Sequence, residues 1–361
     1  MSNYIEVNDK IAFHPGYYIK ELIDELGLTQ EDFAKRLGTT PKNLSLLIRG
    51  EQRLSIDIAA KLSRLIGTSV EYWLNLQKNY DALLAECVLA QELEEEREVF
   101  KALDYKYFRD NYGLPDLPRQ TDKQIEAVRD FLKVSSLSVI AKYDMTVSFR
   151  AATGTAMQAN TIRANAMVQI AINRALETEA PKYNRQAFEK AIEYALTLTR
   201  NHEEFYPLLK ESFNEAGVVF VIMPNHKGSK INGATKKLGN KIMLMVNDRR
   251  LNSDTFWFTL FHEIGHILNG DFGMTLEEDD NNAEEEANNY AENKLIPYEE
   301  YRRFVNSTRR ISTRDICEFA EQIDRDPGIV LGRLQNDGII SFKDRSYDEL
   351  RHRYKVVNVK A

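Results

Sequence analysis

Two histidines four residues apart, His262 and His266, are the residues of this sequence best suited to metal chemistry. Residues i and i+4 share one face of an α-helix, so both imidazoles can bind a single ion from the same side. Glu263 follows the first histidine, and its carboxylate could act as general base toward a water in such a site. The spacing therefore predicts a catalytic metal site. Two structural histidines on a core helix are the alternative.

The segment around these histidines, residues 256–268, is predicted to be a buried helix, because apolar residues surround the pair on most sides. Ser253 and Asp254 are the expected N-caps, and Asn269-Gly270 is the expected end. A helix buried in this way would give a dry and rigid site.

A third ligand is expected from a second helix downstream. Zinc used in catalysis takes three protein ligands and leaves a fourth position for water. The segment from Glu284 to Pro297 has helical spacing, with Ala287 and Ala291 on one side. A carboxylate at its start, in the run Glu284 to Glu286, could therefore complete a Zn²⁺ site.

The composition indicates a soluble, cytoplasmic protein of two or three domains. A net charge of −7 and a pI near 5.6 exclude a globally basic nucleic-acid binder, so any DNA contact must be local. The two cysteines, Cys87 and Cys317, are expected to be buried; they exclude a cysteine-built zinc site and give no disulfide framework. We see no leader-like N-terminus and no apolar run long enough for a membrane span.

Residues 1–80 read as short helices joined by turns. Thr29 and Thr40 are expected N-caps, Pro41 suits the first position of its helix, and Gly38-Thr39 makes a tight turn. Two short helices joined in this way predict a helix-turn-helix. A small helical bundle used only for dimerisation is the alternative.

The remaining chain is expected to form a helical linker or scaffold over 81–215 and an α+β domain over 216–361. In the latter, 217–223 and 241–246 are predicted buried strands. An edge strand is expected near 231–235, and His226 is expected to be exposed. The edge strand would be either a substrate cradle that binds an extended peptide or an ordinary hairpin loop; its candidate residues are Asn232, Gly233 and Ala234.

The motifs H-E-I-G-H, E-A-N-N-Y-A and L-I-P resemble the ImmA/IrrE family of zinc metallopeptidases, whose fold core is similar to that of the gluzincins. The resemblance implies that Glu286, the residue directly before Ala-Asn, is the third zinc ligand beside His262 and His266. It also implies that Glu263 is the catalytic base.

The first segment closely resembles the HigA-type antitoxin domain of the XRE (lambda-repressor-like) class, through L-T-Q-E-D-F-A-K-R-L-G, S-x-L-I-R-G and G-T-S-V-E-Y-W-L-N-L-Q. The segment P-G-I-V-L-G-R-L-Q and the pair Phe149-Arg150 are similar to features of HigA-type proteins with a fused peptidase domain. The resemblance places the helix Pro41–Arg49 in the major groove of DNA. It implies base contacts from Lys42, Asn43 and Ser45, and backbone contacts from Gln30, Thr40 and Arg49.

Residues 1–80 contain ten Lys and Arg against ten Asp and Glu, so the DNA-binding segment is neutral. Dimerisation would then be needed for useful affinity. Pro41 and Leu46 also stand where relatives often carry hydrogen-bonding side chains, which weakens direct readout.

The expected fold is mainly α with a small α+β domain: a lambda-repressor-like domain, a helical middle region and a gluzincin-like zinc metallopeptidase domain. The expected function is that of an antitoxin-like transcriptional regulator, a homodimer on operator DNA. Its peptidase would hydrolyse a peptide bond in a regulatory partner protein, either a substrate or a cognate toxin. The alternative is a non-catalytic repressor whose zinc domain is a sensor or partner-binding module.

Overall fold

The computed structural model describes residues 4–7, 10–142, 155–249, 252–276, 282–307 and 310–356. The Phe149-Arg150 pair lies outside these residues. The chain divides into two compact units, residues 1–95 and 96–361. This division differs from the expected three segments, because most of the middle region packs with the C-terminal domain. No helix among the described residues is long and apolar enough to cross a membrane.

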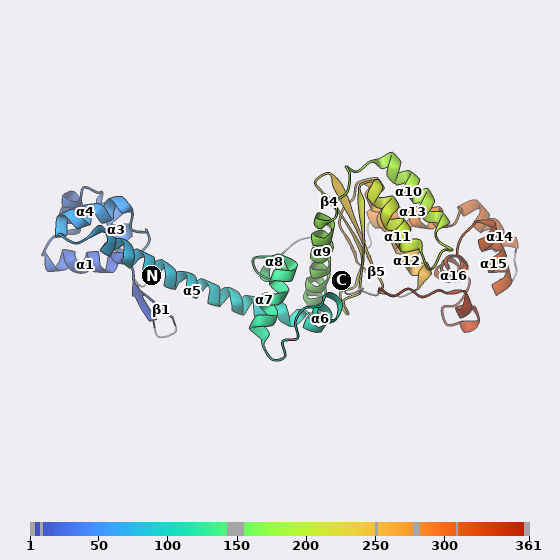
Figure 1. Ribbon diagram of the computed structural model, residues 1–361, viewed down its shortest axis with the longest axis horizontal. Helices are drawn as coiled ribbons and strands as arrows, with labels where there is room; N and C mark the ends of the chain where they lie inside the picture. Colours follow the sequence, from blue (N-terminus) through green and yellow to red (C-terminus); the bar gives the residue numbers. More distant parts are fainter. Residues whose placement is uncertain are drawn as a thin grey trace. The chain divides into compact units, whose positions relative to one another are not determined.

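The first unit is a small helical domain preceded by an antiparallel strand pair (Figure 1). Its apolar faces meet in one core that includes Ile19, Phe33, Leu44 and Leu62. The strand pair gave no signal in the sequence. The elements are β1 (Tyr4–Val7), β2 (Lys10–Phe13), α1 (Pro15–Glu25), α2 (Gln30–Leu37), α3 (Pro41–Ile48), α4 (Ile56–Ile66) and α5 (Val70–Ala102), which continues into the second unit.

The second unit is a four-stranded sheet with helices on both faces. The strand order is β3-β5-β4-β6, with β3 parallel to β5 and β4 antiparallel to both of its neighbours. The elements are α6 (Tyr105–Tyr112), α7 (Thr121–Leu132), α8 (Ser138–Lys142), α9 (Thr155–Glu177), α10 (Arg185–Thr197), α11 (Phe205–Glu215), β3 (Val218–Met223), β4 (Ile231–Leu238), β5 (Lys241–Asn247), α12 (Ser253–Asn269), β6 (Met274–Leu276), α13 (Asn282–Leu295), α14 (Tyr298–Ser307), α15 (Thr313–Gln322), α16 (Pro327–Asn336) and the 3₁₀ helix η1 (Arg345–Leu350).

Strands β3 and β5 are the two predicted buried strands. Their sequences are continuously apolar because helices pack on both faces of the sheet. Alternate residues such as Phe220 and Leu244 belong to the main core of this unit, together with α12. Helix α9 contacts β3, β4 and β5, and it lies on the other side of the sheet in Figure 1. The sheet is therefore a rigid backing for α12.

The expected fold class is confirmed, since the described part of the chain is mostly helical with small sheets. Three predictions of exposure or burial were wrong. His226 is 1% exposed because α6 covers it, with the Tyr107 ring 4.3 Å away between centroids. Cys317 is exposed and Cys87 partly exposed, since each lies on a solvent-facing side of its helix.

Candidate metal centre and DNA-binding unit

Helix α12 carries His262, Glu263 and His266 through the centre of the second unit. Its buried residues include Trp257, Leu260, Phe261 and Ile264, which surround the histidines as expected. The helix ends before Gly270, which adopts φ 82°, in agreement with the predicted end. The predicted N-caps were wrong: the N-cap is Asn252, without a side-chain cap bond, because Ser253 and Asp254 already lie in the first turn and bind other elements.

His262, His266 and Glu284 bring three ligand atoms together. The two Nε2 atoms are 3.0 Å apart. Glu284 places Oε2 3.0 Å from Nε2 of His262 and Oε1 3.4 Å from Nε2 of His266. A tetrahedral ion with bonds of about 2.0–2.2 Å holds its ligand atoms about 3.3 Å apart. The donor set and its spacing therefore fit a divalent metal.

Glu284, not Glu286, is the carboxylate beside the histidines. Glu286 is exposed and accepts a 3.3 Å hydrogen bond from Asn269 Nδ2. The physical reason is the start of α13 at Asn282, which puts Glu284 on the face toward α12. Two residues on an α-helix are about 200° apart, so Glu286 faces away. The expectation of Glu286 as third ligand is corrected on this geometry.

Contacts behind the histidines orient them. Asn288 Oδ1 lies 2.9 Å from Nδ1 of His262, so this nitrogen can donate to the amide while Nε2 faces Glu284. Gly265 lets the two helices approach, because a Cβ there would lie 3.1 Å from the Ala287 Cα. Burial alone would raise the pKa of Glu284, but hydrogen bonds from both histidines lower this pKa to about 2.

Glu263 is fully buried beside this triad. Among the described residues its carboxylate oxygens make no hydrogen bond of good geometry, but the Thr275 side chain on β6 lies close enough to act against the rise of its pKa. Burial raises the pKa of Glu263 to about 7, although the two histidines act in the opposite direction. A buried carboxyl with a pKa near neutrality is suited to taking up and returning a proton.

The predicted edge strand is wrong, because β6 pairs with β4 at Ile231, Gly233 and Ala234. These residues of β4 therefore lie inside the sheet. A three-residue strand such as β6 leaves almost no pattern in a sequence. Gly233 has a different role: a Cβ there would stand 2.3 Å from Oε1 of Glu263, so only glycine leaves room for this carboxylate.

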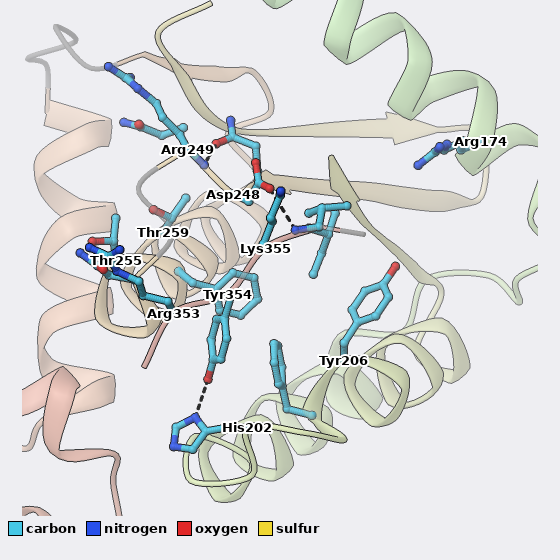
Figure 2. A pocket seen from close by; sticks show the side chains of 17 residues that line it. Arg174, His202, Tyr206, Asp248, Arg249, Thr255, Thr259, Arg353, Tyr354 and Lys355 are labelled. Carbon is cyan, nitrogen blue, oxygen red and sulfur yellow. Dashed lines mark hydrogen bonds between the residues drawn. The ribbon is translucent and has the colours of Figure 1, made fainter. Parts of the chain in front are cut away.

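A cavity of about 510 Å³ lies next to the start of α12 (Figure 2). Asn232, adjacent to Gly233, lines it. Thr259 also lines it and is one helical turn before Glu263. Four cationic side chains and one carboxylate are in its wall: Arg174, Arg249, Arg353, Lys355 and Asp248.

The predicted helix-turn-helix is α2 and α3 of the first unit. Thr29 and Thr40 are the N-caps, and their hydroxyls accept hydrogen bonds from the backbone N–H groups of Asp32 and Asn43, both at 3.1 Å. Pro41 begins α3, as expected. Lys42, Gln30 and Thr40 are exposed on this unit.

The other three predicted DNA contacts, Asn43, Ser45 and Arg49, make hydrogen bonds with neighbouring side chains. Asn43 donates a 2.9 Å hydrogen bond from Nδ2 to the Thr39 hydroxyl. Arg49 donates to Ser45 Oγ at 3.1 Å and binds both carboxylate oxygens of Glu51, at 2.9 and 3.1 Å. Contact with DNA would have to replace these bonds.

Sequence reasoning did not assign roles to Trp73 and Gln77, which lie on α5. Trp73 is 1% exposed and donates from Nε1 to the Thr68 hydroxyl. Gln77 accepts a 2.8 Å hydrogen bond from the backbone N–H of Leu54. The first turns of α5 are thus part of the first unit's core.

Two families match the chain, one in each unit. The helix-turn-helix family matches residues 19–73. The IrrE N-terminal-like domain, of the peptidase M78 family, matches residues 213–324, which contain the candidate metal centre. This second match indicates a metallopeptidase domain.

Similar proteins cover the first unit. An uncharacterized helix-turn-helix-type transcriptional regulator of Escherichia coli K12 is 39% identical over 79 residues, which are 21% of this chain and 84% of that protein. Virulence-associated protein I of Dichelobacter nodosus is 32% identical over 80 residues, 22% of this chain and 74% of that protein. A solved structure described as an antidote protein of a plasmid maintenance system from Nostoc punctiforme is 31% identical, with a TM-score of 0.23, over 23% of this chain and 92% of that one. The chain therefore belongs to the helix-turn-helix transcriptional regulators, and it carries an IrrE-like peptidase domain in its second unit.

Proposed function

We propose that this protein is an antitoxin-like, HigA-type repressor that also acts as a zinc-dependent endopeptidase on a regulatory partner protein. The observation that carries the proposal is the convergence of His262, His266 and Glu284 beside the buried carboxylate of Glu263. Metal binding alone needs no such carboxylate. Its position next to the triad favours hydrolysis.

Zinc fits the two nitrogen donors and one oxygen donor, and when bound it would supply Lewis acidity toward a peptide carbonyl. Asn288 would hold the His262 ring in place. Glu263 would take a proton from the attacking water and pass it to the leaving amine. The apolar surroundings on α12 would strengthen these electrostatic interactions by excluding bulk water.

The substrate is proposed to enter through the cavity in Figure 2. Asn232 joins the cavity wall to the strand behind Glu263, and Thr259 lies one turn before that residue. Because cationic side chains outnumber carboxylates among the described residues of the wall, a peptide segment with acidic residues fits best.

The experiment is a comparison of host lysates incubated with wild type or with Glu263→Gln. New protein N-termini that form only with wild type would identify the cleaved partner. If neither protein produces new N-termini, the result favours the alternative function, a non-catalytic repressor whose zinc domain is a sensor or partner-binding module.

The helix-turn-helix implies DNA binding, and we propose that a homodimer binds an operator upstream of its own gene. Two-fold symmetry predicts two half-sites about one helical turn apart. Replacing Lys42 or Asn43 by alanine should cost roughly 1–3 kcal/mol and relax base preference at one position per half-site. A shift assay on the upstream DNA and its single-base variants measures this.

Lys78→Ala is the control for this prediction, because Lys78 is an exposed lysine on α5 that is outside the helix-turn-helix. The affinity of Lys78→Ala for the operator DNA should be the same as that of wild type. If Lys42→Ala lowered the affinity for the operator and for unrelated DNA by the same factor, base readout by Lys42 would be contradicted.

Arg49→Ala is expected to weaken binding to all sequences alike and to reduce the salt dependence by about one phosphate contact. Glu51→Gln is expected to strengthen binding, because it removes the carboxylate that binds the Arg49 guanidinium in the free protein. A salt titration of both variants is the measurement. An unchanged salt slope in Arg49→Ala would rule out the phosphate contact.

A further inference from the structure

A second group of metal-ligating side chains lies outside the candidate metal centre. His202 lies between α10 and α11, Asp326 is the N-cap of α16, and His352 follows η1 near the end of the described chain. None of the three belongs to the first triad. They come from segments that are far apart in the sequence, so the fold alone brings them together.

The distances within this group suit a metal ion. Nε2 of His202 is 3.1 Å from Oδ2 of Asp326, and Nε2 of His352 is 3.8 Å from the same oxygen. Each residue offers a ligand atom, and these atoms all lie within 4.8 Å of one another. The two carboxylate distances bracket the separation of about 3.3 Å between ligand atoms of a tetrahedral ion.

The carboxylate at the centre of the group is held in place. Asp326 is 1% exposed. Its Oδ1 accepts hydrogen bonds from the backbone N–H of Gly328 at 2.9 Å and from the Ser253 hydroxyl at 3.3 Å. With Oδ1 occupied in this way, Oδ2 is the oxygen presented to both histidines.

The imidazoles are also oriented. Nδ1 of His202 makes a 2.8 Å hydrogen bond with the Tyr354 hydroxyl, drawn as a dashed line in Figure 2. Metal-binding histidines commonly have their second nitrogen held by such a bond. The His352 ring stacks on the His202 ring with centroids 3.5 Å apart, closer than the 4.7 Å between the rings of His262 and His266, and its side chain is 48% exposed, so His352 would turn outward from this stack to share an ion. Solvent can therefore supply a further ligand on that side.

We propose that His202, Asp326 and His352 form a second metal site, for a divalent transition ion of which zinc fits best. Imidazole nitrogens are good ligands for such ions, whereas Mg²⁺ and Ca²⁺ prefer oxygen ligands. A set of two imidazoles and one carboxylate therefore favours a transition ion.

The site would join the C-terminal segment to the start of α12. The backbone N–H of Ser253 already donates to the His352 carbonyl at 2.9 Å, and Asn252 pairs with Arg353. Tyr354 and Lys355, which follow directly, line the cavity in Figure 2. An ion bound here would therefore stabilise one wall of the cavity.

The test uses full-length protein in which His262→Ala and His266→Ala have disabled the first site. Calorimetric titration of the metal-stripped protein with zinc should show one remaining equivalent. Adding His352→Gln should weaken this binding by more than about 100-fold, since even the loss of an outer-shell partner costs 10- to 100-fold. X-ray absorption of the zinc-loaded protein should show two imidazole ligands.

Arg353→Gln is the matched control, because it changes the neighbouring residue without removing a ligand, and it should retain zinc. His352→Gln alters a half-exposed side chain, so its folding should persist and can be verified by circular dichroism. The proposal is overturned if the protein without the first site binds no zinc, or if His352→Gln and Arg353→Gln bind it equally.

Discussion

Glu263→Gln is expected to lower the rate of partner cleavage by roughly 10²- to 10⁴-fold while zinc content and folding persist. Glutamine keeps the shape of the side chain but cannot accept a proton from water. The Glu263 carboxylate is buried and lies close to both histidines, which oppose the rise of its pKa on burial. The rate is measured with a peptide that carries the cleaved sequence, and zinc by elemental analysis.

Glu286→Gln is the matched control for this rate, because it makes the same chemical change on an exposed side chain outside the triad. Its rate should stay near that of wild type. Cleavage by Glu263→Gln at the wild-type rate would mean that another group takes the proton.

Glu284→Ala is expected to remove the metal from the first site, whereas Glu286→Ala is expected to retain it. Glu284 contacts Nε2 of both histidines and Glu286 contacts neither. The loss of one of three protein ligands should reduce zinc affinity by more than about 100-fold, more than the loss of an outer-shell partner. Competition with a chelator of known affinity measures the difference.

The background for this measurement is a chain with His202→Gln and His352→Gln, so that zinc in the proposed second site does not mask the loss. If Glu286→Ala lost zinc and Glu284→Ala kept it, the geometry of α13 would be different in the metal-bound protein, and the sequence-based choice of Glu286 would stand.

Features that depend on neighbouring residues could be predicted from the sequence. The threonine caps of α2 and α3, the end of α12 at Gly270 and the two apolar strands are such features. Each is specified by residues within a few positions, so spacing and residue type are enough to locate it. The pair His262 and His266 belongs to this class, because one helix sets its geometry.

Features that depend on distant segments could not be predicted. The carboxylate beside the histidines depends on the residue at which α13 starts, and a shift of two positions turns a side chain to the opposite face. The cover of β4 depends on the three residues of β6, and the burial of His226 depends on α6. Likewise His202, Asp326 and His352 show no motif together, since only the folded chain makes them neighbours.

Helix α5 has a consequence for how the two activities could be separated. Trp73 and Gln77 complete the core of the first unit, and Arg53 binds Asp81 at 2.5 Å, so a fragment that stops before Val70 would lack essential packing. A fragment that continues to Glu95 retains all of these contacts. Proteolytic cleavage in α5 between Glu86 and Glu95 would therefore release the helix-turn-helix unit with these contacts, and with the Lys10–Glu86 ion pair at 3.2 Å, so that its DNA binding could be measured without the peptidase domain.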